Sequence, residues 1–170
     1  IDPIVQAFEN DSVRLTPYRA HSDEIRDHAK AYLKEDLSPQ QFVSEVGIVG
    51  LGKMGGNIAR HLIKEGYGVS GFNRSREATD ALSKEGMFAA YSLEALVENL
   101  EAPRLVWIML PHGAPTDETI QTLAGLLQAG DMVIDGGNSP FADAQKHFDL
   151  LHTKGIEFVD VGVSGGPMGA

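Results

Sequence analysis

From position 46 onward, short apolar runs alternate with longer segments in which apolar residues recur every three or four positions. The short runs predict β-strands, and the periodic segments predict amphipathic helices. We expect strands at 46–49, 68–72, 87–90, 105–110, 132–135 and 156–161. Strands that alternate with helices are typical of an α/β fold with helices on both faces of a parallel sheet. The pattern therefore predicts a Rossmann-type doubly wound sheet with its six strands in the order 3-2-1-4-5-6.

Helices are expected between these strands, and most of them end at a glycine. Ser75 and Thr116 are predicted N-caps, because their hydroxyls can accept hydrogen bonds from the first amides of a helix. Ala81 is expected to face the core. The pair Ser139-Pro140 is expected to open the last helix, which carries Phe141 among its apolar residues.

Residues 1–45 differ in pattern from the rest of the chain. Apolar residues at helical spacing predict an amphipathic helix over about 22–34, and Ser38-Pro39 offers a start for a second, short helix. We expect a helical appendage over 1–45, either the tail of a preceding domain or an arm packed on the sheet, and a cofactor-binding domain over 46–170. Because the chain starts at Ile1 and stops after a glycine-rich loop, we interpret it as a fragment.

Composition narrows the classes of function. The 170 residues suffice for one full core. A formal net charge of -10 disfavours nucleic-acid binding, because an acidic surface repels phosphate backbones. The chain lacks cysteine, which fits a reducing compartment, and its histidines show no metal-ligand spacing, so no metal is expected. No apolar run approaches the about 18 residues of a membrane span, so we expect no membrane association.

The glycine-rich segment after the first strand predicts a dinucleotide site. Gly50, Gly52 and Gly55 have the spacing GxGxxG, with a predicted strand before them and a helix after. In this motif the first glycine permits a tight turn, the second lets backbone approach a pyrophosphate, and the third lets helix and strand pack closely. The phosphates then lie on the amides of the helix N-terminus. The loop also contributes Leu51, Lys53 and Met54.

The end of the second strand predicts which dinucleotide binds. About 18 residues after the third glycine, where NAD-selective folds usually have a carboxylate, the chain has Asn73, followed by Arg74 and Ser75. A guanidinium at this point can pair with a 2′-phosphate and stack on adenine. We therefore predict NADP⁺ as cofactor, with NAD⁺ as the alternative.

Further polar or glycine-rich loops follow the remaining strands at 110–112, 135–139 and 163–166. Since the carboxyl ends of parallel strands share one edge of the sheet, we expect these loops to converge with the glycine-rich loop. Asn138 and Ser164 can hydrogen-bond hydroxyl groups. Alternatively, Asn138 is a turn residue and Ser139 only the N-cap of the next helix.

These motifs resemble the cofactor domain of decarboxylating 6-phosphogluconate dehydrogenases, within the β-hydroxyacid dehydrogenase superfamily. The segments 50–57 (GLGKMGGN), 73–75 (NRS), 135–139 (DGGNS) and 163–166 (VSGG) are similar to motifs of that family, and the resemblance covers about 46–170. It implies oxidative decarboxylation of 6-phosphogluconate to ribulose 5-phosphate with NADP⁺, a step of the pentose phosphate pathway and of gluconate utilisation, in the cytoplasm. The implied substrate contacts are Asn138, Ser164, Gly165 and Gly166. The implied cofactor contacts are the glycine-rich loop, residues 73–75, Asn138, and Leu110, Pro111 and His112 beside the nicotinamide.

The resemblance also implies what these 170 residues lack. The family's general base, a lysine, its general acid, a glutamate, and its main dimer contacts belong to a helical domain that follows the VSGG motif. We therefore expect no catalytic residue in this fragment and no turnover by it; the full-length protein is expected to be a homo-oligomer, whereas the fragment can be a monomer.

Two alternative functions stay open, as does the role of one residue that departs from the family's pattern. An NAD(P)-dependent β-hydroxyacid dehydrogenase shares the first and last motifs, but that branch carries D-x-S-T where this chain has DGGNS. A non-catalytic dinucleotide-binding module is the other alternative. The departure is His112, at a position where many members of the family have alanine. It could hydrogen-bond nicotinamide or substrate, or be a solvated loop residue, and the second interpretation is favoured.

Overall fold

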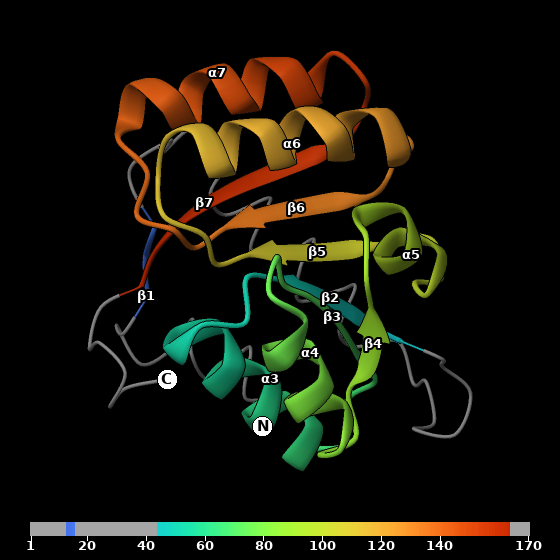
Figure 1. Cartoon of the computed structure of the whole chain (residues 1–170). Helices are drawn as coiled ribbons and strands as arrows, with labels where there is room; N and C mark the ends of the chain where they lie inside the picture. The colour runs from blue at the N-terminus through green and yellow to red at the C-terminus, as the bar shows by residue number, and fades with distance from the viewer. Residues whose placement is uncertain (1–12, 16–43, 164–170) are drawn as a thin grey trace.

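The computed structural model describes residues 13–15 and 44–163, which form one sheet with helices on both faces (Figure 1). The strands are β1 (Val13–Leu15), β2 (Val46–Val49), β3 (Val69–Phe72), β4 (Phe88–Ala90), β5 (Leu105–Ile108), β6 (Met132–Asp135) and β7 (Glu157–Val163). The helices are α3 (Lys53–Lys64), α4 (Arg76–Ser83), α5 (Leu93–Glu98), α6 (Ala114–Leu126) and α7 (Phe141–His152).

The order of the strands confirms the predicted topology. Across the sheet the order is β1-β7-β6-β5-β2-β3-β4, and the six strands from β2 to β7 are parallel to one another. Numbered along the chain, these six strands follow the order 3-2-1-4-5-6 from β4 to β7. The direction of winding reverses between β2 and β5, and ligands of such sheets bind beyond the carboxyl ends of the strands at this point.

Strand β1 lies outside the predicted pattern. It pairs antiparallel with β7, with Val13 opposite Val163, and so adds a seventh strand at that edge of the sheet. Three residues are too few to show a periodicity, so the sequence did not indicate a strand here. The helices expected at 22–34 and from Ser38 lie outside the described residues.

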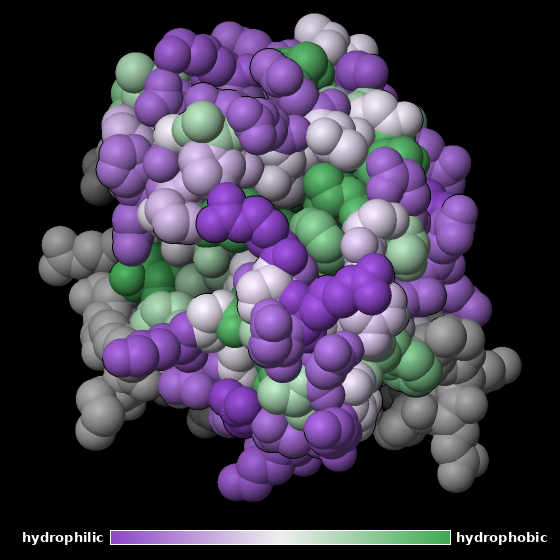
Figure 2. All heavy atoms as spheres, in the orientation of Figure 1, coloured by the Kyte–Doolittle hydropathy of each residue, from purple (hydrophilic) through white to green (hydrophobic). Residues whose placement is uncertain are grey.

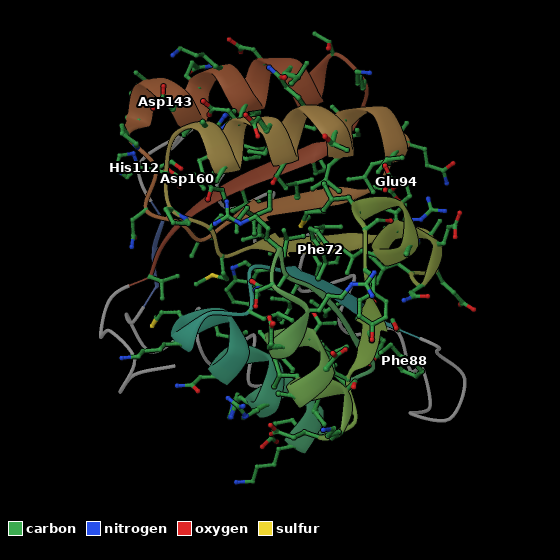
Figure 3. All side chains as sticks on the ribbon, in the orientation of Figure 1. Phe72, Phe88, Glu94, His112, Asp143 and Asp160 are labelled. Atoms are coloured by element: carbon green, nitrogen blue, oxygen red, sulfur yellow. The ribbon has the colours of Figure 1, made fainter. Side chains whose placement is uncertain are left out.

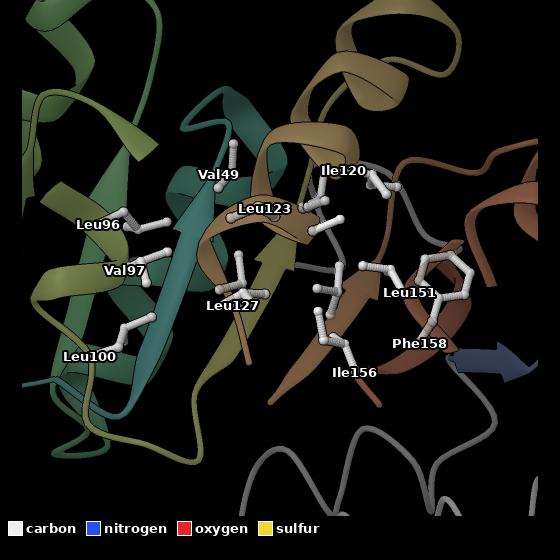
Figure 4. Packing of buried hydrophobic residues seen from close by; sticks show 14 of the residues in the cluster. Val49, Leu96, Val97, Leu100, Ile120, Leu123, Leu127, Leu151, Ile156 and Phe158 are labelled. Atoms are coloured by element: carbon white, nitrogen blue, oxygen red, sulfur yellow. The ribbon is translucent and has the colours of Figure 1, made fainter. Parts of the chain in front are cut away.

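Two apolar cores cover the two faces of the sheet. Figure 1 shows α3 and α4 on one face and α6 and α7 on the other. Side chains alternate along β5: Val106 and Ile108 join a cluster with α5, α6 and α7, whereas Leu105 packs with α3 and α4. Figure 4 shows the first cluster, in which Leu123 and Leu151 come from α6 and α7. This alternation explains why the central strands are apolar without interruption.

Three expectations about the helices are wrong. Thr116 lies inside α6, whose N-cap is Gly113, with Pro115 in the first turn. Ala81 is exposed, because α4 buries Thr79 and Leu82 instead. Phe141 is 60% exposed, since it is the first residue of α7 and the buried face of that helix begins at Ala144. In the two described ranges no helix is both long enough and apolar enough to span a membrane.

Candidate functional site

The glycine-rich loop between β2 and α3 makes a hydrogen bond to the end of β3 and a very close backbone contact with the first turn of α3. Gly50 has a φ of 95°, and its amide donates to the carbonyl oxygen of Phe72 over 2.9 Å. A β-carbon on Gly55 would lie 2.0 Å from the carbonyl oxygen of Gly50. Any side chain at position 55 would therefore push α3 away from the end of β2, as expected for the first and third glycines of the motif.

The second glycine faces open space. A β-carbon on Gly52 would meet no atom within 4 Å, and the residue is exposed as the N-cap of α3. The amides that follow it, from Lys53 to Gly55, belong to the first turn of a helix and so have no intrahelical partner. The first turn of α3 has no acidic residue, and Lys53 is exposed. The end of α3 thus offers amides and one cation to an anionic group.

Asn73 ties this loop to the loop after β3. Its Oδ1 accepts a hydrogen bond from the amide of Leu51 over 3.0 Å, and its Nδ2 donates to the carbonyl oxygen of Ser75 over 3.2 Å. The two segments from which a dinucleotide site was predicted are therefore in direct contact. The sequence did not indicate this bond, because its partners are 22 positions apart.

The loop after β3 carries two arginines with different surroundings. Arg74 is exposed and has no hydrogen bond or ion pair within the described part of the chain. Arg76 places its guanidinium carbon 5.0 Å from the ring centre of Tyr91, whose hydroxyl donates to Asp80 over 2.7 Å. Of these two arginines, Arg74 is therefore the one whose guanidinium is more available to an anionic group of a ligand.

Ser75 has a partner that the sequence analysis missed. Its Oγ donates to Oε2 of Glu77 over 2.7 Å, and this hydrogen bond, together with the backbone amide of Glu77, holds the pKa of that carboxyl below its ordinary value. Ser75 is the N-cap of α4, as predicted, but its side chain accepts no capping hydrogen bond. The signal that could have indicated the contact is a glutamate two positions after a helix-capping serine.

The loops after β5 and β6 meet at the same edge of the sheet. The amide of Met109 donates to the carbonyl oxygen of Val49 over 2.8 Å, and a β-carbon on Gly137 would lie 2.3 Å from the carbonyl oxygen of Leu110. Pro111 is held by Thr116, whose Oγ1 donates to its carbonyl oxygen over 2.9 Å. In Figure 2, apolar surface lies between more hydrophilic regions at the left of the view, where β5 and β6 end.

His112 lies at the rim of this edge. It is exposed, and Figure 3 shows it near Asp143 of α7. The pKa of Asp143 is lowered, first by the hydrogen bond from Lys146 and to a smaller extent by the charge of His112. These surroundings fit the solvated-loop interpretation of His112, and contact with a nicotinamide stays a prediction.

The DGGNS segment is organised around a buried carboxylate. Asp135, which is 0% exposed, accepts hydrogen bonds from the amide of Gly137 over 2.9 Å and from Oγ of Ser139 over 2.6 Å. The hydroxyl of Ser139 therefore closes the loop, and the N-cap of α7 is Pro140 rather than Ser139. Asp135 is a site residue that the sequence analysis did not single out.

Asn138 connects the DGGNS segment to the end of β7. It has a φ of 58°; its Oδ1 accepts from the amide of Val163 over 3.1 Å, and its Nδ2 donates to the carbonyl oxygen of Val163 over 3.5 Å. Val163 directly precedes Ser164, Gly165 and Gly166, which lie outside the described residues. Asn138 thus holds the DGGNS segment at the start of the expected substrate loop.

Replacing Asn138 should release this connection. We expect Asn138→Ala and Asn138→Gly both to speed hydrogen exchange at the amide of Val163, because both remove the side-chain acceptor. Alanine should in addition lower the free energy of unfolding by about 1 kcal/mol relative to glycine, since only alanine is strained at positive φ. Exchange at Val163 that matches the parent chain in both variants would show that the bond does not form in solution.

Among the described residues, no group of three or more histidine, aspartate and glutamate side chains is arranged to hold a metal ion. The site is instead a row of loops with amides, one free arginine and a helix N-terminus at the carboxyl edge of a doubly wound sheet. This fold and this site define a dinucleotide-binding domain of the Rossmann type.

A family model for the NAD binding domain of 6-phosphogluconate dehydrogenase matches residues 45–170. The chain belongs to this family. The resemblance drawn from the glycine-rich, DGGNS and VSGG motifs is thereby confirmed.

Curated relatives carry the same name. The chain is 40% identical over 131 residues to "6-phosphogluconate dehydrogenase, NAD(+)-dependent, decarboxylating" of Bacillus subtilis, which covers 75% of this chain and 28% of the relative. It is 43% identical over 130 residues to "6-phosphogluconate dehydrogenase, decarboxylating" of Staphylococcus epidermidis, with 74% and 28% covered. The chain thus spans about 28% of the length of these relatives.

Solved structures agree in fold. The 6-phosphogluconate dehydrogenase of Plasmodium falciparum superposes with a TM-score of 0.69 at 30% identity, over 74% of this chain and 28% of that one. The 3-hydroxyisobutyrate dehydrogenase of Mycobacterium tuberculosis superposes with a TM-score of 0.68 at 27% identity, over 74% of this chain and 42% of that one. Both are dehydrogenases by name, which supports a nicotinamide dinucleotide as the ligand of this fold.

Proposed function

We propose that residues 46–170 are the cofactor-binding domain of an NADP-dependent 6-phosphogluconate dehydrogenase and that residues 1–45 are an appendage to it, whose strand β1 pairs with β7 at the edge of the sheet. The observation that carries the proposal is the convergence of three motifs on one sheet edge. Asn73 joins the glycine-rich loop to the loop after β3, and Asn138 joins the DGGNS segment to the end of β7. The names of the curated relatives support 6-phosphogluconate as the substrate of the whole protein. A cytoplasmic location and a homo-oligomeric full-length protein remain predictions.

The choice of NADP⁺ rests on Arg74. The residue is exposed and unpaired within the described ranges, and the position before it is the neutral Asn73. The relatives differ in the cofactor that their names give. The Bacillus subtilis protein is NAD⁺-dependent by name, whereas the Plasmodium falciparum enzyme is described in complex with NADP⁺. A free guanidinium beside a position without a carboxylate supports NADP⁺ for this chain.

Calorimetric titration with NADP⁺ and with NAD⁺ tests this choice. We expect tighter binding of NADP⁺, and we expect Arg74→Ala to remove about 1.5–3 kcal/mol of NADP⁺ binding, which is roughly ten- to a hundredfold in affinity. Binding of NAD⁺ should change little, since a 2′-hydroxyl makes no ion pair. Arg104→Ala is not a suitable control, because that arginine is part of a buried ion pair. Lys84→Ala, which removes an exposed cation after α4, serves instead. An NADP⁺ affinity that Arg74→Ala leaves unchanged would contradict the proposal.

The residues of the chain have distinct tasks in the proposed reaction. A bound nicotinamide dinucleotide supplies the hydride acceptor for oxidation of the substrate hydroxyl. The first amides of α3 would hold the pyrophosphate, and Leu110, Pro111 and His112 would flank the nicotinamide. Asn138 would contact both ligands: after its two bonds to Val163, its exposed amide still has one N–H and one lone pair to offer.

The substrate would also contact Ser164, Gly165 and Gly166. The lysine and glutamate that the family resemblance assigns as base and acid follow the VSGG motif. We therefore expect these 170 residues to bind the dinucleotide without oxidising 6-phosphogluconate. Turnover by this chain alone would contradict that expectation.

A β-hydroxyacid dehydrogenase is the second candidate. The superposition with the 3-hydroxyisobutyrate dehydrogenase of Mycobacterium tuberculosis is nearly as good as that with the phosphogluconate enzyme. Against it stands the DGGNS segment, whose Gly137 and Ser139 are both bound to Asp135. Comparing 6-phosphogluconate with 3-hydroxyisobutyrate as substrates of the full-length protein separates the two candidates.

A further inference from the structure

Glu77 is a carboxylate directly after the loop that is proposed to recognise the 2′-position of the cofactor. It is the second residue of α4 and follows Ser75 by two positions. We infer that Glu77 limits the preference of this site for NADP⁺ over NAD⁺, because it accepts the hydrogen bond that the hydroxyl of Ser75 can donate and places a negative charge beside the proposed position of the 2′-phosphate. The inference rests on the proposed function.

The first observation is the hydrogen bond between the two side chains. Ser75 Oγ donates to Glu77 Oε2 over 2.7 Å. A serine hydroxyl has one proton, so the same hydroxyl cannot donate to a phosphate while this bond exists. The position of Ser75 is also constrained, because its carbonyl oxygen accepts from Nδ2 of Asn73. A 2′-phosphate bound at this loop must therefore either displace Glu77 or bind without a hydrogen bond from the hydroxyl of Ser75.

The second observation is the balance of charge over the loop and the adjoining part of α4. Of its two guanidinium groups, only that of Arg74 is without a partner in the described part of the chain, since Arg76 lies over Tyr91. The carboxylates of Glu77 and of Asp80, which accepts from Tyr91, oppose these cations. A doubly charged phosphate meets this repulsion, whereas an uncharged ribose hydroxyl does not.

Glu77 also offers NAD⁺ a favourable contact. In NAD-selective Rossmann folds a carboxylate at this end of the sheet accepts hydrogen bonds from the ribose hydroxyls. Asn73 cannot fully take that role, because its Oδ1 already accepts from Leu51 and its Nδ2 donates to Ser75. Glu77 is the nearest carboxylate along the chain to this loop, and its side chain is exposed. Glu77 thus disfavours binding of a cofactor with a 2′-phosphate but not of one with a 2′-hydroxyl.

A purely structural role for Glu77 makes a different prediction. An acidic residue in the first turn stabilises a helix through its dipole, whichever ligand is bound. Loss of that effect would lower the stability of α4 and weaken the binding of both cofactors equally. The ratio of the two affinities therefore distinguishes specificity from support of the helix.

Glu77→Gln is the variant to measure, because glutamine keeps the length of the side chain and an acceptor for Ser75 but removes the charge. We expect calorimetry to show NADP⁺ bound about fivefold more tightly or better, with the NAD⁺ affinity unchanged or lower. The gain for NADP⁺ should shrink in high salt, because the repulsion between exposed charges is screened.

Glu94→Gln is the matched control. Glu94 stands in the first turn of α5, two positions after Ser92, and its pKa is lowered by its own backbone amide and by a hydrogen bond from that serine (Figure 3). This variant removes the charge from the same local arrangement outside the loop of Asn73 and should leave the ratio of affinities unchanged.

The outcomes separate the inference from the proposed function. If Glu77→Gln changes the affinities for NADP⁺ and NAD⁺ equally, the inference is overturned and the proposed function is not. The same holds if the Glu94→Gln control gains as much NADP⁺ affinity as Glu77→Gln. If the parent chain binds neither dinucleotide, the proposed function fails together with the inference. If Arg74→Ala lowers the preference for NADP⁺ while Glu77→Gln leaves it unchanged, the proposed function stands and Glu77 has no part in specificity.

Discussion

Gly55→Ala is expected to lower the free energy of unfolding by about 3 kcal/mol, at the upper end of the usual cost of overpacking. The added β-carbon would lie 2.0 Å from the carbonyl oxygen of Gly50, so either α3 or the end of β2 must move. Because the obstacle is backbone, no side-chain rotation relieves the contact. Urea denaturation followed by circular dichroism measures the change.

Gly52→Ala is the matched variant within the same loop. A β-carbon there meets no atom within 4 Å, and the φ of -68° suits alanine, so the stability should fall by less than about 1 kcal/mol. The methyl group would instead occupy the space that a pyrophosphate is proposed to approach, and dinucleotide affinity should fall about tenfold or more. Equal stability of both variants would contradict the close contact of α3 with β2.

Asp131→Ala is expected to have a similarly large effect on stability. Asp131 is 0% exposed and accepts hydrogen bonds from the amide of Arg104 over 2.7 Å, from Nη1 of Arg104 over 3.2 Å and from the amide of Gln128 over 2.9 Å. Removing the buried carboxylate leaves the amides of Arg104 and Gln128 without an acceptor and the guanidinium of Arg104, which is 22% exposed, without its counter-ion. The expected loss is about 3 kcal/mol in the free energy of unfolding.

An exposed ion pair provides the control for Asp131. Lys146 and Asp143 are 2.9 Å apart on the surface of α7, with side-chain exposures of 74% and 31%. Lys146→Ala should leave the denaturation midpoint unchanged within error, because water solvates and screens both charges. If Asp131→Ala were as mild as Lys146→Ala, the buried pair would not form as described.

The fold was predictable from residues 46–163 because each central strand is buried on both faces and each helix on one. Along β5, for example, every position is apolar because alternate side chains enter different cores. Parallel strands then place their loops on one edge, which is why the positions of Gly50, Asn73 and Asn138 followed from the order of elements. The start of α6 was misplaced at Thr116, although Pro115 in the first turn was a usable signal for an earlier start.

Contacts between distant residues were not predictable in the same way. Composition and periodicity cannot distinguish a buried Asp131 from a solvated turn residue, because its partner Arg104 is 27 positions away. The bond from Leu51 to Asn73 and the pair of Asn138 with Val163 depend likewise on the finished sheet. They show that the two asparagines predicted to contact a ligand also hold the loops of the site together.

The central claim is that the carboxyl edge of this sheet binds a nicotinamide dinucleotide. Titration of the ¹⁵N-labelled 170-residue chain with NADP⁺, followed by amide chemical shifts, tests it most directly. We predict saturable changes concentrated at 50–56, 73–77, 110–113 and 135–139, with those at 73–77 smaller when NAD⁺ replaces NADP⁺. Saturable changes confined to the amino ends of the strands, or no saturable change with either dinucleotide, would contradict the account.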